Sequence, residues 1–176
     1  MALPTKILPG YVASLWAQSE TSRTTLSGPF STANLSVFTA QMATVAGTAA
    51  GGTGTNGVAL AVEAIPAFGQ DDAVANYAVA GARQSDKIPV QAAPTSLTIT
   101  AAWNPSDTAI QQVRTDAYSG TTDRTYVVAA YDGTNGAYYA FNARVGSFQI
   151  DAQPGAEAKA IFTLHPRGGQ YGWSNN

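Results

Sequence analysis

The sequence contains no cysteine, a single histidine and few charged residues. None of the 176 residues is cysteine, which excludes both a disulfide framework and a metal site built from thiolates. Charged residues make up 11% of the chain, less than half of the roughly 25% found in ordinary globular proteins. The formal net charge is -2 and 45% of the residues are hydrophobic, a composition that indicates neither disorder nor membrane insertion.

The low fraction of charged residues has a physical explanation. Charged side chains are depleted from the cores of protein interfaces, and a net charge near zero favours self-association. We therefore expect repeated subunit contacts to cover much of the folded surface. A neutral surface rich in Thr and Ser is the alternative explanation.

The length fits one domain over residues 1–176, large enough to be held by a hydrophobic core alone. No run of eighteen apolar residues occurs, so we expect no membrane insertion. Lys6 and two prolines interrupt what would have to be the apolar region of a signal peptide, so we read none and expect folding in the cytoplasm.

Three segments stand apart from the alternating pattern. Residues 1–10 form an apolar arm punctuated by Pro4 and Pro9, which do not permit a helix there. Residues 40–57 are rich in Gly, Ala and Thr and are expected to be a flexible loop. Residues 167–176 are expected to be a flexible aromatic tail.

Apolar and polar residues alternate along much of the rest of the chain, which predicts half-buried strands. An Asp–Gly and an Asn–Gly pair within 132–136 predict a hairpin between two of these strands, and a change of parity at Gly146 predicts a bulge. Asp71 and Asp72 ahead of the third strand also fit the start of a short helix. The predicted strands are residues 11–17, 58–65, 76–84, 96–103, 125–131, 137–150 and 156–165.

One helix is predicted at about residues 105–118. Asn104 is a suitable N-cap, Pro105 suits the first helical position, and Ser119–Gly120 suits the end. Its apolar stripe would carry Ile110, Val113, Arg114 and Ala117. The pattern as a whole predicts a mainly β fold, an antiparallel β-sandwich or partial barrel with one flanking helix and long loops. The expected core residues are Trp103, Ile110, Val113, Phe141 and Val145.

Motifs for catalysis or ligand binding are weak. Residues 52–57 have the pattern G-x-G-x-x-G, which binds phosphate only when a helix follows it. Here a predicted strand follows instead. His165 has no catalytic partner in the sequence pattern, and the acids are too scattered for a paired-carboxylate or calcium site. No basic stripe is present to hold nucleic acid. The sequence thus predicts a protein that is not an enzyme and that needs no cofactor or metal.

The order of strand, helix, hairpin and strand resembles the major tail tube proteins of long-tailed bacteriophages, which have the lambda-type tail tube fold. The resemblance covers about residues 60–166. Residues 96–105 look like the family's central strand entering its single helix, and residues 124–128, 132–133 and 140–145 look like the hairpin that follows. Upstream, residues 11–16 are similar to the first strand, and residues 65–68 with 77–83 resemble the hairpin that precedes the central strand.

The resemblance implies a structural virion protein that assembles in the host bacterial cytoplasm into hexameric rings. Stacked rings would form the hollow tail tube, through which the tape-measure protein and then DNA pass without specific binding. The partners implied are other copies of the chain, the tape-measure protein, the tail terminator and the tail-tip proteins. Candidate subunit-interface residues are Leu3, Ile7, Leu8, Phe68, Tyr77, Tyr171 and Trp173.

A second hypothesis belongs to another class. Exposed aromatic rings such as Tyr138, Tyr139 or Trp173 would suit a monomeric β-sandwich module that binds a ligand or carbohydrate. That hypothesis predicts a monomer at every concentration, whereas a tube subunit predicts polymers.

Overall fold

A computed structural model describes residues 12–18, 57–68, 70–77, 86–131, 136–167 and 171–175. Its elements are β1 (Val12–Gln18), β2 (Gly57–Leu60), β3 (Val62–Ala64), β4 (Gln70–Tyr77), β5 (Asp86–Pro94), β6 (Leu97–Ala102), α2 (Thr108–Ser119), β7 (Asp123–Tyr131), β8 (Gly136–Asp151), β9 (Lys159–Pro166) and β10 (Tyr171–Asn175). The arm at 1–10 and residues 40–56 of the expected loop lie outside the described residues.

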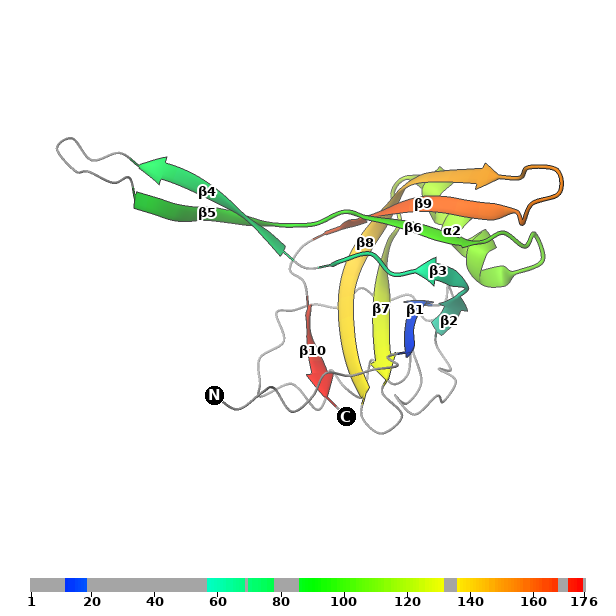
Figure 1. Cartoon of the computed structure of the whole chain (residues 1–176), viewed down its shortest axis with the longest axis horizontal. Coiled ribbons are helices and arrows are strands. Elements are labelled where there is room, and N and C mark those ends of the chain that lie inside the picture. The colour runs from blue at the N-terminus through cyan, green and yellow to red at the C-terminus, as the bar shows by residue number, and fades with distance from the viewer. Residues whose placement is uncertain are drawn as a thin grey trace.

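The fold is mainly β, as the alternation predicted. Eight strands form one antiparallel sheet in the order β2-β1-β7-β8-β9-β6-β3, with β10 pairing with β8, and β4 and β5 form a separate two-stranded sheet. The single described helix, α2, packs on the large sheet and contacts β8 and β2 (Figure 1). Antiparallel strands with one buried face are what alternating sequences produce.

The two edges of the large sheet meet in one short stretch of chain. β2 pairs with β1 at one edge, and β3 pairs with β6 at the other. Only Ala61 separates β2 from β3, and its carbonyl accepts a hydrogen bond of 2.9 Å from the backbone N–H of Ala102. The sheet therefore curls towards a barrel without becoming a closed one, which leaves few free strand edges.

The core lies between the curled sheet and the inner face of α2. Ile110 and Val113 from the helix and Phe141 and Val145 from β8 are all buried in it. Trp103 is only partly buried, and its ring meets Phe148 edge-on with 5.8 Å between the centroids.

The helix begins three residues later than predicted. Asp107 is the N-cap, and its carboxylate accepts a hydrogen bond from the backbone N–H of Ala109. Asn104 instead closes a turn before the helix, because its carbonyl accepts from the N–H of Asp107. The end agrees with the sequence: Gly120 has a φ of 61°, and its N–H bonds to Asp116. Both Asn and Asp suit a cap, and only the turn geometry decides between them.

The predicted bulge in β8 is present. The register with β9 shifts between Val145 and Ser147, so Gly146 has no partner of its own. An extra residue in a strand exchanges the faces to which the following side chains point. Phe148 accordingly packs against the core, while Ile150 at the strand end is 45% exposed.

Three strands differ from the sequence prediction. Residues 70–77 form β4 where 76–84 was expected, and neither β5 nor β10 was anticipated. The short helix considered after Asp71 and Asp72 is absent, since both residues lie in β4. Residues 78–85 lie outside the described residues.

Candidate functional site

The most conspicuous feature of the molecule is the ribbon formed by β4 and β5. The two strands pair along their whole length, from Gln70 opposite Pro94 to Tyr77 opposite Asp86. The ribbon projects away from the large sheet, and none of the described strands other than β4 and β5 pairs with it (Figure 1). A two-stranded ribbon that stands alone in water is at best marginally stable, so this one is expected to gain from a partner surface.

Proline shapes the ribbon. Pro89 pairs with Val74 at the place where the register shifts, next to the step from Ala73 to Val74. Proline lacks a backbone N–H and is confined to sheet edges and irregular positions. Pro94 ends the ribbon just before the chain enters the large sheet as β6. These prolines are compatible with strands that have one free edge.

The helix is attached to the sheet by a buried ion pair that the sequence did not reveal. The Asp116 carboxylate accepts hydrogen bonds from Nε and Nη2 of Arg124 at 2.6 and 2.8 Å. Nη1 of Arg124 and Nε2 of Gln112 each donate to the backbone carbonyl of Gln18 at 2.8 Å. One guanidinium thus joins α2, β7 and the end of β1.

This pair corrects the predicted helix stripe. Asp116, not Arg114, lies on the buried side of α2. The Arg114 guanidinium lies partly exposed, 5.5 Å from the centroid of the Tyr118 ring, and Tyr118 itself is 73% exposed. Asp116 follows Ile110 by six residues, and a single acid at that spacing forms no recognisable sequence pattern. Only the position of Arg124 in the sheet shows that Asp116 is buried and paired.

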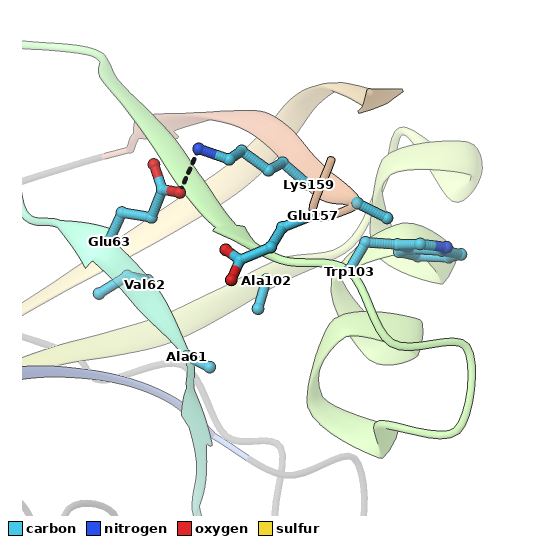
Figure 2. Close-up of a pocket in the computed structure, with 8 residues that line it drawn as sticks. Ala61, Val62, Glu63, Ala102, Trp103, Glu157 and Lys159 are labelled. Atoms are coloured by element: carbon cyan, nitrogen blue, oxygen red, sulfur yellow. Dashed lines mark ion pairs between the residues drawn. The ribbon is translucent and has the colours of Figure 1, made fainter. Parts of the chain in front are cut away.

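An open pocket of about 520 Å³ lies beside β3, β6 and the start of β9 (Figure 2). Val62, Trp103 and three alanines provide its apolar part, and the charged side chains are those of Glu63, Glu157 and Lys159. Glu63 forms an ion pair with Lys159, and this hydrogen bond together with the Glu63 charge raises the pKa of Lys159. This is a surface ion pair, with the Lys159 and Glu63 side chains 38% and 45% exposed.

His165 makes a polar contact that does not have catalytic geometry. Its Nδ1 lies 2.9 Å from Oγ of Ser96, and both residues are exposed. In a serine nucleophile system, Nδ1 is held by a carboxylate and Nε2 faces the serine. Here Nε2 lies over Gly146. Within the described part of the chain, no group of His, Asp and Glu side chains could hold a metal ion.

The predicted interface residues are distributed over several places. Phe68 is 40% exposed, and its ring lies 4.6 Å from that of Tyr139. Tyr77 ends β4, at the outer part of the ribbon, while Tyr171 and Trp173 belong to β10. Phe68 thus lies near β10, because Trp173 is the register partner of Tyr139, whereas Tyr77 lies in the separate ribbon. Leu3, Ile7 and Leu8 lie outside the described residues.

The aromatic residues proposed for a carbohydrate site lie in two paired strands, β8 and β10. Tyr139 is half-buried between the rings of Phe68 and Phe141, with centroids at 4.6 and 6.0 Å. Tyr138 lies in β8 opposite Ser174, and Trp173 pairs with Tyr139. Gly57, the last residue of the glycine motif, begins β2, so a strand and not a helix follows that motif.

Comparison with known proteins identifies the fold but no family. No protein-family model matches the chain, and no curated protein sequence matches it. The fold is similar to that of a chain in the cryo-EM structure of the anti-feeding prophage baseplate, 6-fold symmetrised, with a TM-score of 0.52 and 11% sequence identity. The match covers 69% of this chain and 84% of that chain. None of the described helices is long and apolar enough to cross a membrane.

Proposed function

We propose that this protein is a structural component of a phage-type tail, and specifically the subunit of the tail tube. Six copies form a ring, and stacked rings form a hollow tube through which DNA passes into the host. The subunits assemble in the bacterial cytoplasm and end in the virion tail. Besides its own copies, the subunit contacts the tape-measure protein within the tube and the terminator and tip proteins at its ends.

The observation that carries this proposal is the β4–β5 ribbon. It extends from the sheet with no strand of the described chain on either outer edge, and such a ribbon needs further packing to be stable. A ribbon that docks on a different surface of the next copy makes a heterologous contact. Contacts of that kind, repeated, close into rings or continue as filaments.

Three further features support the proposal. The chain carries only 11% charged residues, as expected where neighbouring copies cover the surface. A net charge of -2 suits a channel that lets DNA move, because phosphate binding depends on basic groups. The fold similarity is to a chain of a prophage baseplate whose structure is 6-fold symmetrised.

Negative-stain electron microscopy over a concentration series tests the proposal. The full chain should form rings or hollow tubes as its concentration rises. The matched variant replaces residues 73–91 with Asn-Gly, because Asp72 and Ala92 are register partners and this two-residue turn connects adjacent antiparallel strands. It should keep the β-sheet circular-dichroism spectrum of the parent but stay monomeric.

The first of two contrary results would count against the tube itself, and the second against the ribbon as the contact between copies. A full chain that remains a monodisperse monomer at every concentration would favour the ligand-binding module. Rings that form equally well without the ribbon would show that assembly uses other surfaces.

A further inference from the structure

The ribbon leaves the large sheet at a definable point. β6 and β9 pair from Ala102 opposite Lys159 to Leu97 opposite Leu164. Beyond that last pair the two strands separate. The chain upstream of β6 becomes β5 and pairs with β4, whereas β9 continues along β8, with His165 opposite Arg144.

A side-chain hydrogen bond spans this fork. Ser96 lies between β5 and β6, one residue before the last pair. Its Oγ is 2.9 Å from Nδ1 of His165, one residue after that pair on β9. The bond therefore joins the two strands just where their backbone pairing ends.

The imidazole of His165 is held against a third strand. Gly146 is the bulged residue of β8, and a Cβ at this position would collide with Nε2 and Cδ2 of His165. The ring fills the space that any other residue's side chain would take at position 146. The absence of a side chain at Gly146 thus allows the ring to lie between β8 and Ser96.

We infer that Ser96, His165 and Gly146 form a clasp that fixes the direction in which the β4–β5 ribbon leaves the sheet. Only Thr95 and Ser96 connect β5 to β6, and a link this short sets a direction only if it is held. The bulge puts Gly146 next to the His165 ring. In this position Nδ1 of the ring contacts Oγ of Ser96, which lies in the two-residue link at the base of the ribbon. The clasp residues are positioning residues, and their effect on assembly rests on the proposed function.

The absence of cysteine allows a direct measurement of the ribbon direction. Two spin labels are attached through Ala75→Cys in β4 and Gln149→Cys, an exposed position in β8. Pulsed electron spin resonance on the full-length protein, kept dilute, then gives the distribution of distances between ribbon and sheet. The labelled parent should give one narrow distribution, and Ser96→Ala should broaden and shift it.

Ser147→Ala is the matched control. Oγ of Ser147 donates to Oγ1 of Thr163 at 3.1 Å, another exposed hydroxyl bond from β8 to β9. This bond lies one pair inside the fork and joins β8 to β9, not the two strands that separate, so its loss should leave the distance distribution unchanged. Gly146→Ala tests the clasp through the His165 ring instead of through Ser96. The new methyl group must displace the ring, so the distance distribution should broaden as it does in Ser96→Ala.

A second measurement reports the clasp itself. His165 is the only histidine, so its two ring nitrogens give unique signals in a nitrogen-15 NMR spectrum. Loss of the Ser96 bond should shift the Nδ1 signal in Ser96→Ala and not in Ser147→Ala. This holds even if Gly146→Ala fails to fold.

The outcomes separate this inference from the proposed function. A folded Ser96→Ala protein with the distance distribution of the parent would overturn the clasp, whether or not the parent assembles. If the distribution broadens but the parent never assembles, the clasp stands and the proposed function fails. If both hold, Ser96→Ala should form fewer and less regular rings than Ser147→Ala at the same concentration.

Discussion

Asp116 and Arg124 face each other in the interior with two hydrogen bonds, of 2.6 and 2.8 Å, and their side chains are 5% and 1% exposed. A guanidinium and a carboxylate in this two-bond arrangement fix each other's orientation as well as their charge. Because Arg124 lies in β7 and Asp116 in α2, the pair joins the helix directly to the sheet.

Removing one member of this pair should be strongly destabilising. Asp116→Ala leaves a buried guanidinium without its counter-charge, and breaking such a pair costs about 3–5 kcal/mol. Urea unfolding followed by circular dichroism measures the change in the free energy of unfolding. The control is Asp123→Ala, which removes the more exposed partner of Arg144 and should cost under about 1 kcal/mol. Equal losses in the two variants would contradict the assigned role of the buried pair.

Tyr126 provides a second test in the same region. Its hydroxyl is buried and has no hydrogen-bond partner among the residues that the structure describes, so Tyr126→Phe removes a polar group that is costly to bury. The variant should be at least as stable as the parent at neutral pH. Tyr118→Phe, at an exposed position, should change nothing. A clear loss of stability in Tyr126→Phe would mean that the hydroxyl has a partner.

Alkaline pH should enlarge the difference between Tyr126→Phe and the parent. Burial, and secondarily the charge of Asp116, raises the pKa of Tyr126 well above its ordinary value of 10.0. The folded state therefore keeps this proton at a pH where the unfolded chain loses it, and the stability of the parent falls as pH rises above 10.0. The Phe variant lacks this contribution. Denaturant unfolding at neutral pH and above pH 10.0 compares the two proteins.

The ion pair beside the pocket predicts a different pH effect. Its hydrogen bond with Glu63, and then the Glu63 charge, raises the pKa of Lys159 above 10.5. The stabilisation is present while Lys159 is protonated and is lost as pH rises through this raised value. Glu63→Gln should lower the pKa of Lys159 towards 10.5, as followed by NMR titration of the side chain. An unchanged titration would mean that the two side chains do not pair in solution.

The sequence predicted those parts of the fold that depend on short-range patterns. The strand ending near Ala102 and the hairpin between β7 and β8 were recognisable because one face of each is buried and the residues alternate. The bulge at Gly146 was recognisable because it changes that alternation. Gly120 marked the end of the helix because a positive φ favours glycine.

Features that depend on long-range contacts were not predictable in this way. Asp116 and Arg124 each look ordinary in sequence, and only packing of the helix on the sheet makes them partners. β5 was missed because Pro89 and Pro94 argue locally against a strand, although a ribbon with a free edge tolerates them. His165 likewise gained its neighbours Ser96 and Gly146 only through strand pairing.

Hydrogen exchange provides the most direct test of which surfaces are covered on assembly. The segments that contain Leu8, Phe68, Tyr77, Tyr171 and Trp173 should exchange faster in the monomer than in the assembled state, because neighbouring copies cover them only after assembly. β7 is the internal reference, since Tyr126, Val127 and Val128 are buried within one subunit and should be equally protected in both states. Mass spectrometry of peptic peptides from the dilute and the assembled protein measures the difference. Equal protection of the ribbon in the two states would contradict its role as the contact between copies, and protection gained only by other segments would identify the surfaces that assembly uses instead.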